Sequence, residues 1–349
     1  NAWWNSFLLN SENRIYLKIM KKISIQNDIW LLLDERTGNR TQVLGVGNAL
    51  NTNYMEKLFK YNVISKLPNW LLQASILHVN KKGRKQFKPP WPKIVIGCGR
   101  KSSPVGLWIK EKSKNKTHFI QIMWPGWPYK NIDLIAIPEH DKINPKINTI
   151  NFLTSPHIFS KEYLDKAKIK WSKTLNTLPH PRVAVSIGGD TKKNKFLPSH
   201  SSKMIKLLIK FIGSKGSLMI TTSRRTSNEV YERIKNEVDI LGKRVILWKM
   251  DLKNNNPYPG FLSYADAVAV TGDSISLCSE ACSTGKPVLI FAPENTTTLK
   301  QKTFHQALIK KGIAKYLEDT NLDILKKISY HPLNESQYIA EEIKKRFLN

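Results

Sequence analysis

Two consecutive glycines near the middle of the chain are the clearest candidates for binding chemistry. Residues 183–187 are small or β-branched, as is typical of a buried parallel strand, and Gly188 and Gly189 follow them directly, with Asp190 next. Because glycine has no Cβ atom, the backbone amides of such a pair can turn toward an anion. Ligands of open α/β sheets bind at the carboxyl ends of the strands. The sequence therefore predicts an anion-binding turn, with an ordinary strand-to-loop turn as the alternative.

A second group of anion-binding side chains follows the next apolar run. Residues 216–222 are typical of a strand, and Ser223, Arg224 and Arg225 stand between this strand and a helix predicted at 229–241. Hydroxyl groups, guanidinium groups and a helix N-terminus all stabilise phosphate. We favour a phosphate site over the alternative, an arginine pair that is merely exposed on the surface.

A third candidate lies at the start of another helix. The strand predicted at 265–271 leads into a loop and a helix at 272–282. Ser274 or Ser276 can cap this helix and contact an anion at its N-terminus. Glu280 lies in the first turns of the same helix.

The first half of the chain repeats this arrangement with different polar residues. The apolar run at 29–33 ends at Asp34, and a polar loop containing glycine leads into a helix predicted at 43–50. The run at 92–99 ends at Arg100, whose guanidinium suits a phosphate or a carboxylate. A strand, loop and helix in this order point the helix N-terminus at a ligand. The loop lacks the GxGxxG spacing, so it does not imply a dinucleotide.

Three consecutive ionisable residues follow a further predicted strand. The run at 132–137 ends in Pro138, and Glu139, His140 and Asp141 come next. Such a group at the carboxyl end of a strand can hold a general base. A charged surface turn is an equally weighted alternative.

The elements that carry these residues alternate between strand and helix in both halves, and the alternation stops between about 150 and 180. This pattern predicts an α/β protein with two Rossmann-like domains that face a cleft. We place the first domain at 28–175 and the second at 176–349, with residues 1–27 as an N-terminal extension. The helix predicted at 335–347 is a candidate to pack back on the first domain.

The charge of the chain is strongly positive. Lysine and arginine number 56 against 27 aspartate and glutamate residues, which gives a formal net charge of +29. Such a charge suits nucleic acid, an anionic membrane surface or phosphorylated substrates. The lysines are scattered and asparagine is also abundant, as AT-rich coding alone would produce. We therefore take the charge as weak evidence for a partner and expect no nucleic acid.

The cysteine spacing excludes the common metal and disulfide motifs. Cys98, Cys278 and Cys282 form no CxxC pair, so we expect no metal and a reducing compartment. No apolar run approaches the roughly 18 residues of a transmembrane helix. These features predict a cytoplasmic protein, with peripheral attachment to the inner face of the membrane as a further option.

The second half of the chain resembles nucleotide-sugar glycosyltransferases of the two-domain GT-B architecture. The matching features are, in chain order, the strand at 265–271, the loop Gly272-Asp273-Ser274, the helix with Glu280, and Gly285-Lys286-Pro287 before a buried strand. The resemblance implies that Ser274 and Ser276 bind the donor diphosphate and that Glu280 binds the ribose hydroxyls. It also matches Gly188 and Gly189 to the glycine-rich loop that begins the second domain of that family.

Over residues 28–317 the chain is more specifically similar to the mitochondrial fission ELM family. The motifs that carry this likeness are Trp30-Leu31-Leu32-Leu33-Asp34 with Gly38-Asn39 and Gln42, Gly97-Cys98-Gly99-Arg100, Pro138-Glu139-His140-Asp141, Ile187-Gly188-Gly189-Asp190, Ser223-Arg224-Arg225-Thr226, Asn256-Pro257-Tyr258 and Asp273-Ser274-Ile275-Ser276. Position 272 is glycine where alanine is expected. Plant members of the family are linked to recruiting a dynamin-related fission protein, and bacterial members are described as predicted nucleotide-sugar enzymes.

Together these observations lead to one preferred hypothesis, a metal-independent GT-B glycosyltransferase that needs no cofactor beyond its nucleotide-sugar donor. The donor-binding residues would be Gly188, Gly189, Asp190, Ser223, Arg224, Arg225, Ser274, Ser276 and Glu280. The acceptor-side residues would be Gly38, Asn39, Gln42 and Arg100. His140 is the preferred general base because histidine titrates near neutral pH, with Glu139, Asp141 and Asp34 as alternatives. The basic charge suits an envelope or lipid-linked acceptor at an anionic membrane.

The alternative is a non-catalytic adaptor on the same scaffold, as the role of the plant members suggests. Fold alone does not decide between the two, because one fold hosts many functions. Polar side chains at the ends of strands in both halves favour the enzyme. An NAD-linked epimerase is a weaker option, since the chain shows neither GxGxxG nor a suitably placed Tyr-xxx-Lys pair.

Overall fold

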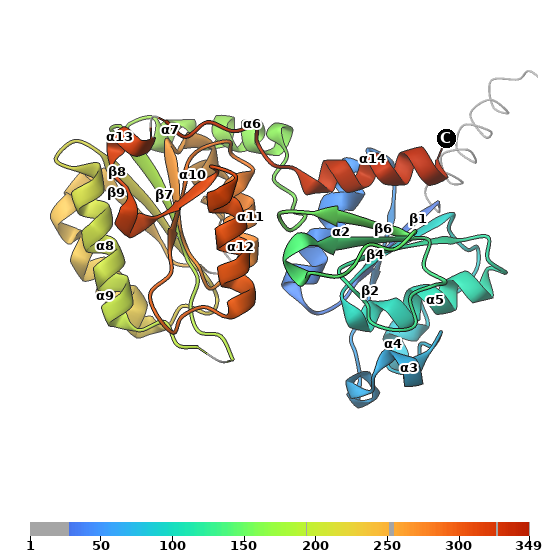
Figure 1. Cartoon of the computed structure of the whole chain (residues 1–349). Coiled ribbons are helices and arrows are strands. Elements are labelled where there is room, and N and C mark those ends of the chain that lie inside the picture. Colours follow the sequence, from blue (N-terminus) through green and yellow to red (C-terminus); the bar gives the residue numbers. More distant parts are fainter. Residues whose placement is uncertain (1–27, 193, 251–254, 326, 349) are drawn as a thin grey trace, which may run out of the picture. The chain divides into compact units, whose positions relative to one another are not determined.

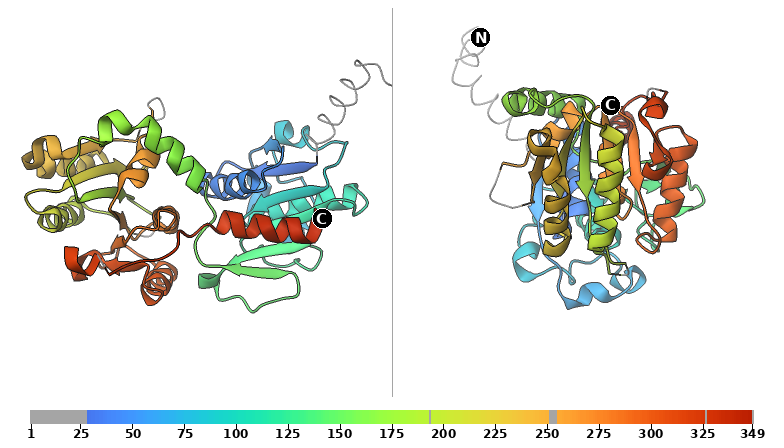
Figure 2. Two further views of the ribbon diagram at one scale, coloured as in Figure 1. Left: turned by 90° about the horizontal axis from the view of Figure 1, so that it is seen from above. Right: turned by 90° about the vertical axis from the view of Figure 1, so that its left-hand side faces the viewer.

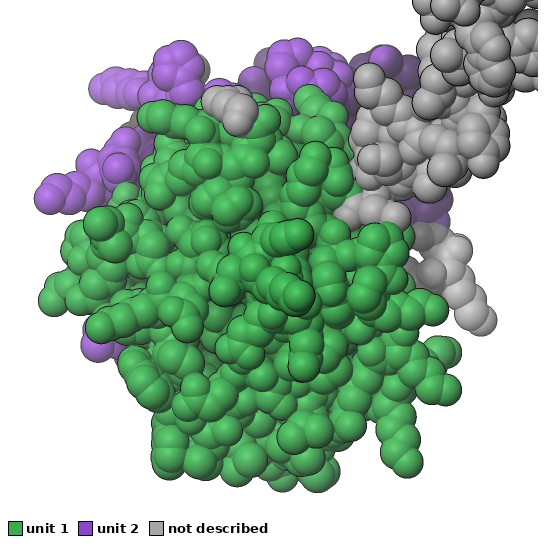
Figure 3. Space-filling view, turned by 90° about the vertical axis from the view of Figure 1, so that its right-hand side faces the viewer, with its two compact units in different colours: residues 1–152, 336–349 green, residues 153–335 purple. Residues whose placement is uncertain are grey.

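The computed structural model describes residues 28–192, 194–250, 255–325 and 327–348 (Figure 1). The chain divides into two compact units, coloured separately in Figure 3. Unit 1 consists of residues 1–152 and 336–349, and unit 2 of residues 153–335. The N-terminal extension predicted at 1–27 lies outside the described residues.

Unit 1 is built on a six-stranded parallel sheet in the order β2-β1-β3-β4-β5-β6. Its strands are β1 (Ile29–Leu33), β2 (Met55–Leu58), β3 (Ile94–Cys98), β4 (His118–Ile122), β5 (Leu134–Pro138) and β6 (Thr149–Phe152). Every residue of β1, β3 and β5 is buried. Strands covered on both faces are continuous apolar runs, which is why the sequence pattern predicted these three.

Helices cover both faces of this sheet. Its helices are α2 (Thr37–Ala49), α3 (Asn69–Leu72), α4 (Lys81–Arg84), α5 (Ser103–Lys112) and α14 (Glu335–Phe347), with 3₁₀ turns η1 (Val63–Lys66), η2 (Arg100–Ser102) and η3 (Glu139–Asp141). The apolar residues of α2 and α14 share one core cluster with the sheet, and those of α5 share the other. Figure 2 shows α14, in red, alongside the strands of unit 1, as expected for the last helix.

Unit 2 repeats the plan in the order β12-β11-β10-β7-β8-β9, again with every pair parallel. Its strands are β7 (Arg182–Ile187), β8 (Ser217–Thr222), β9 (Val245–Trp248), β10 (Ala267–Thr271), β11 (Val288–Phe291) and β12 (Ala314–Tyr316). Its helices are α6 (Lys161–Lys170), α7 (Ser172–Leu175), α8 (Pro198–Ile212), α9 (Asn228–Val238), α10 (Tyr258–Tyr264), α11 (Ile275–Cys282), α12 (Leu299–Lys310) and α13 (Leu322–Leu325), with η4 (Asp239–Arg244) and η5 (Leu317–Asp319).

The helices of unit 2 also divide between two faces. Residues of α8 and α9, which lie side by side in Figure 2, share one core cluster, and residues of α6, α10, α11 and α12 share the other. The predicted fold class is therefore confirmed, with two α/β units that each contain a parallel sheet. Among the described residues, none of the helices combines the length and the apolar character that crossing a bilayer requires.

The units divide elsewhere than the sequence analysis expected, at 152/153 rather than at 175/176. The boundary predicted at 175/176 includes residues 153–175 in the first domain. In the structure Leu153, Phe159, Leu164 and Leu175 are buried in one cluster with Phe261 of α10. This packing makes the stretch part of unit 2.

Candidate functional site

Each sheet has a point where two neighbouring strands send their helices to opposite faces. In unit 2, β7 and β10 are neighbours. The helix after β7 is α8, which packs into one core cluster, while α11 after β10 packs into the other. Open α/β sheets bind ligands at such a switch point, outside the carboxyl ends of the strands. The loops that begin at Gly188 and Gly272 therefore border the candidate site of unit 2.

The diglycine loop is held by side chains from the loop after β10. The Gly188 amide donates to Thr271 Oγ1 at 2.7 Å, and the Gly189 amide donates to Asp273 Oδ2 at 3.2 Å. A Cβ atom on Gly188 would lie 2.2 Å from Asp273 Oδ1. The two glycines are thus required for close approach within the protein. The amides that the sequence analysis pointed at an anion instead face Thr271 and Asp273.

Arg225 fastens the same loop from the side of β8. Its Nη1 lies 2.7 Å from Asp273 Oδ2 and donates to the carbonyl oxygens of Gly189 at 2.9 Å and Asp190 at 3.1 Å. Asp273 is buried, so this guanidinium neutralises a carboxylate inside the protein. Arg225 therefore holds the loop in place, and its neighbour Arg224 is also exposed.

Two more predicted donor-site residues also stabilise the loop. Ser223 Oγ donates to the Gly188 carbonyl at 2.8 Å. Asp190 accepts from Lys195 Nζ at 2.8 Å and from the Phe196 amide at 2.9 Å. These hydrogen bonds, with that from Lys195 the stronger influence, lower the pKa of the Asp190 carboxyl.

The N-terminus of α11 stands at the edge of the switch point. Ser274 is its N-cap and accepts a hydrogen bond from the Leu277 amide at 3.3 Å. Ser276, in the first turn, is partly exposed. The aligned peptide dipoles give this helix end a partial positive charge, which would favour an anion near Ser274 and Ser276.

Glu280 lies further along α11; the residue is partly exposed, and its carboxyl end lies beside the buried Tyr258. Burial raises the pKa of its carboxyl to about 7, and a hydrogen bond from Tyr258 opposes this rise. Tyr258 comes from α10, and its hydroxyl also lies beside Ser186 near the end of β7. The hydroxyl oxygens of Tyr258 and Ser186 are buried, and within the described part of the chain neither has a hydrogen-bond partner of normal geometry. Three elements thus bring Glu280, Tyr258 and Ser186 into one row.

Tyr258 and Ser186 were not among the predicted site residues. Tyr258 belongs to the Asn256-Pro257-Tyr258 motif, which the sequence analysis used only as a family feature. Ser186 is a polar residue inside the otherwise apolar strand β7. A buried strand with a single hydroxyl at its carboxyl end was the available signal.

A buried histidine lies behind the loop after β10. His305 of α12 is fully buried, and burial lowers the pKa of its ring to about 4. A Cβ atom on Gly272 would lie 2.7 Å from His305 Cε1 and 2.8 Å from Ala292 Cβ. The ring therefore accounts for glycine at position 272, where alanine was expected.

Unit 1 has its own switch point between β1 and β3. Asp34, directly after β1, is buried and accepts from the Arg36 amide at 2.9 Å, from Asn39 Nδ2 at 3.0 Å and from Tyr61 Oη at 3.2 Å. Gly99, after β3, has φ +78°, and a Cβ atom there would lie 2.9 Å from Asn39 Nδ2. Asp34, Asn39 and the loop after β3 therefore lie close together. The sequence analysis placed them on the same side of the proposed site.

Two other predicted residues of this edge are engaged by the chain itself. Arg100 donates to the carbonyl oxygens of Leu67 at 2.7 Å and Ser65 at 3.0 Å and to Asn69 Oδ1 at 3.1 Å. Gln42 of α2 is buried and points its Nε2 toward Met123 Sδ at 3.9 Å. Gly38, in the first turn of α2, has open space around it. Arg100 therefore organises the segment beside the site rather than presenting a free guanidinium.

The three ionisable residues after β5 lie apart from Asp34. They form η3, in which Glu139 is exposed and His140 and Asp141 are partly buried. Because β3 and β4 stand between β1 and β5, the strand spacing separates η3 from the β1 edge by about 14 Å. The structure does not bring the candidate bases together in one place.

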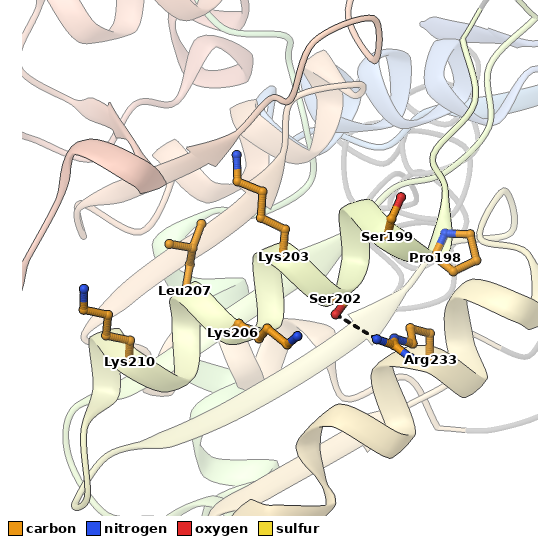
Figure 4. Close-up of a pocket in the computed structure, with 8 residues that line it drawn as sticks. All are labelled: Pro198, Ser199, Ser202, Lys203, Lys206, Leu207, Lys210 and Arg233. Carbon is orange, nitrogen blue, oxygen red and sulfur yellow. Dashed lines mark hydrogen bonds between the residues drawn. The ribbon is translucent and has the colours of Figure 1, made fainter.

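Neither a cluster of metal ligands nor the groove along α8 belongs to the features described so far. In the part of the chain that the structure describes, no group of three or more His, Cys, Asp or Glu side chains is arranged to hold a metal ion. A hollow of about 700 Å³ lies along α8 (Figure 4). We call it the α8 groove; it is lined by Pro198, Ser199, Ser202, Lys203, Lys206, Leu207, Lys210 and Arg233. Arg233 Nη2 donates to Ser202 Oγ at 3.2 Å, and Lys203 Nζ lies 3.4 Å from Glu318 Oε1.

The chain is similar in sequence to a known protein family and to two of its relatives. The model of the family described as mitochondrial fission ELM1 matches residues 37–347. The chain is 32% identical to the uncharacterized protein RP120 of Rickettsia prowazekii, over 91% of this chain and 98% of that protein. It is 27% identical to the mitochondrial fission protein ELM1 of Arabidopsis thaliana, over 78% of this chain and 69% of that protein.

Solved structures share the fold at much lower sequence identity. The UDP-GlcNAc 2-epimerase of Neisseria meningitidis, a structure bound to UDP-GlcNAc, matches with a TM-score of 0.56 and 14% identity, covering 91% of this chain and 100% of that one. MurG of Acinetobacter baumannii matches with a TM-score of 0.53 and 12% identity, covering 91% and 99%. At these identities the likeness shows the fold alone.

Proposed function

The chain belongs to the mitochondrial fission ELM1 family, and from its GT-B-like fold and the site in unit 2 we propose that it is a glycosyltransferase with a nucleotide-sugar donor. The single observation that carries this proposal is the convergence at the β7/β10 switch point. There the N-terminus of α11, capped by Ser274, belongs to the same helix as Glu280, whose carboxylate lies beside the Tyr258 hydroxyl. These are the two chemistries that a nucleoside diphosphate needs, one for its anion and one for its ribose hydroxyls.

In the proposed complex the donor diphosphate contacts the first turn of α11 at Ser274 and Ser276, and Arg224 lies near the same edge. The bond from the sugar to the diphosphate breaks during transfer, so negative charge grows on the leaving diphosphate. A helix dipole and an arginine aimed at that charge stabilise it without a metal ion. The neighbour bound to UDP-GlcNAc supports a nucleotide-sugar as the ligand class.

Unit 1 is proposed to bind the acceptor, an envelope or lipid-linked glycan. A base must take the proton of the attacking hydroxyl. His140 and Asp34 are the two candidates with different environments, since Asp34 already accepts three hydrogen bonds while His140 stands on a surface turn. Because about 14 Å of sheet separates β1 from β5, only one of them can reach a given acceptor hydroxyl.

The donor site is tested first by calorimetry with UDP, GDP, CMP, ADP and dTDP. We expect micromolar affinity for one of them in the native protein and at least a tenfold loss in Glu280→Ala. Glu232→Ala is the matched control, because Glu232 is an exposed glutamate on α9 of the same unit. If none of the nucleotides binds, the adaptor alternative replaces the transferase. Equal affinity in Glu280→Ala removes this residue from the donor site.

The base is tested once a donor is known. We expect His140→Ala to lower turnover at least a hundredfold, a typical contribution of general base catalysis, and to leave nucleotide affinity unchanged. Asp34→Asn is the paired variant, which keeps the size of the side chain. If only Asp34→Asn loses turnover, Asp34 and not His140 is the base. If both variants keep full activity, neither residue is the base.

The adaptor remains the second candidate because of the likeness to the Arabidopsis thaliana mitochondrial fission protein ELM1. An adaptor binds a protein partner and has no use for a nucleotide. The nucleotide titration therefore separates the two functions directly.

A further inference from the structure

We propose that residues 63–77 of unit 1 form a docking surface for an anionic phospholipid bilayer. The inference starts from an uneven distribution of apolar side chains. Among the described residues, sixteen large apolar or aromatic side chains are exposed, and six of them lie within this stretch of the chain. They are Val63, Ile64, Leu67, Trp70, Leu71 and Leu77. Such concentration is unusual, because single exposed apolar residues are normally scattered over a surface.

In this stretch, which we call the 63–77 segment, two polar side chains are buried while several apolar side chains are exposed. Its polar side chains Ser65 and Asn69 are buried, whereas Val63 is 78% exposed, Trp70 55% and Leu71 51%. Asn69 Nδ2 donates to the carbonyl oxygens of Arg100 and Pro125, both at 2.9 Å. The polar groups thus fix the segment to the body of unit 1, and the apolar groups are left facing out.

Hydrogen bonds to neighbouring residues hold the segment in the conformation that exposes these side chains. Arg100 binds the backbone of Ser65 and Leu67, and Lys101 Nζ donates to Ser65 Oγ at 2.8 Å. At the other end of the segment, Asn62 Nδ2 donates to the Leu77 carbonyl at 2.8 Å, and Arg84 donates to the same carbonyl. The segment is therefore held at both ends, and it presents its apolar residues without having to refold.

The charge around the segment selects the kind of partner. Residues 57–110 contain twelve lysines and arginines and not one aspartate or glutamate. Lys66 lies within the segment, and Lys82 and Lys85 follow it on and after α4; all three are exposed. An apolar face with a tryptophan and a rim of lysines is typical of proteins that lie in a membrane interface. Lysine stems cover apolar surface while their ammonium groups reach the anionic lipid headgroups.

The segment is also linked to the candidate acceptor site. Tyr61, two residues before it, donates to Asp34 Oδ2, and Arg100 carries the loop after β3. A bilayer bound here would lie next to the β1/β3 edge, where a lipid-linked acceptor could be taken up. This consequence rests on the proposed function, whereas lipid binding itself can be measured whether or not the chain transfers sugar.

The test is flotation of the full chain with vesicles of phosphatidylcholine alone or of phosphatidylcholine and phosphatidylglycerol in equal parts. We expect binding to the anionic vesicles and at least tenfold weaker binding to the neutral ones. Trp70→Ser/Leu71→Ser should lose at least tenfold in affinity for the anionic vesicles. Ile147→Ser, an exposed apolar residue elsewhere in unit 1, should bind like the native protein.

A charge-matched pair of variants separates the segment from the rest of the basic surface. Lys82→Glu/Lys85→Glu should weaken binding to anionic vesicles several-fold, whereas Lys206→Glu/Lys210→Glu in the α8 groove should not. These changes are on exposed lysines, so they test the idea even if the Trp70 and Leu71 variant does not fold. The inference is overturned if the native chain does not bind anionic vesicles, or if binding is lost in Lys206→Glu/Lys210→Glu but not in Lys82→Glu/Lys85→Glu. Nucleotide titration of the same variants keeps this outcome distinct from failure of the proposed function.

Discussion

Single residues in unit 2 do more than their types alone suggested. Gly188, Ser223 and Arg225 were predicted to meet phosphate, and the structure uses all three to fix the loop after β7. Glu280 keeps its predicted position and gains a partner in Tyr258. The partners of the diglycine amides lie more than eighty residues away in the sequence. No local pattern could have indicated them.

Glu280 makes the stability of the protein depend on pH in a defined direction. Burial raises the pKa of its carboxyl from an ordinary value of 4.5 to about 7. Between these values the folded state binds more protons than the unfolded state, so this residue lowers the free energy of unfolding as the pH rises from about 4.5 to about 7. Glu280→Gln lacks this effect. Urea denaturation should therefore show Glu280→Gln gaining stability relative to the native protein across that window.

The control for this prediction is Glu232→Gln on α9, whose side chain is exposed. Its stability difference from the native protein should be flat over the same pH range. A flat difference for Glu280→Gln as well would mean that the carboxyl is solvated in the folded protein.

At the scale of elements, buried strands were predicted more reliably than their neighbours. β1 and β3 are buried throughout, so an apolar run was enough to locate them. β6 alternates between buried and partly or fully exposed residues and was missed, as was the three-residue β12. Both strands lie at the edges of their sheets, where their faces are incompletely buried, so they lack a continuous apolar run.

The first helix shows why boundaries were harder. The sequence analysis placed its start at 43, whereas α2 begins at Thr37. Its first turn contains Gly38 and Asn39, which are poor helix formers in isolation. Burial of Val43 and Val46 in the core holds the helix, and Asn39 extends to Asp34. Tertiary contacts therefore decide this boundary.

The contacts that Arg225 makes between the loops of β7, β8 and β10 should contribute to stability. Arg225→Ala leaves the buried Asp273 carboxylate without its 2.7 Å partner and frees two carbonyl groups. Since the guanidinium is itself partly exposed, we expect a loss of about 2 kcal/mol in the free energy of unfolding. Urea denaturation measures it.

Arg224→Ala is the matched control for that variant, because its side chain is exposed next to Arg225. It should change stability by less than about 0.5 kcal/mol. A loss in Arg225→Ala no larger than in Arg224→Ala would show that the ion pair is solvated and does not fasten the loop.

For the whole molecule, the two sheets and their parallel order were predictable from alternating strands and helices. The division into units was not, because residues 153–175 contain mostly polar helix with a narrow apolar face. Only the packing of Leu164 and Leu175 against α10 assigns them to unit 2. The basic charge, by contrast, is weak evidence for an anionic partner when taken from composition alone, and the proposed lipid surface at the 63–77 segment makes that prediction testable at named residues.

The last helix should carry much of the stability of unit 1. Ile339 and Ile343 are fully buried against the first sheet. Replacing both by alanine should cost about 3 kcal/mol each. Limited proteolysis followed by mass spectrometry should then find new cleavage sites in unit 1 before unit 2. Lys345→Ala, exposed on the same helix, should leave the native pattern unchanged, and equal cleavage of both units would contradict the prediction.

The return of the chain to unit 1 also affects the order in which the two units can fold during synthesis. Unit 2 is one continuous stretch, and its ends are joined where Glu335 Oε1 accepts from the amides of Leu153 at 3.1 Å and Thr154 at 3.2 Å. Domains fold as units while the ribosome releases the chain. The first sheet emerges first but lacks α14, so it waits as an incomplete core while the second half is translated. The half that is made later is thus the half that can finish folding earlier.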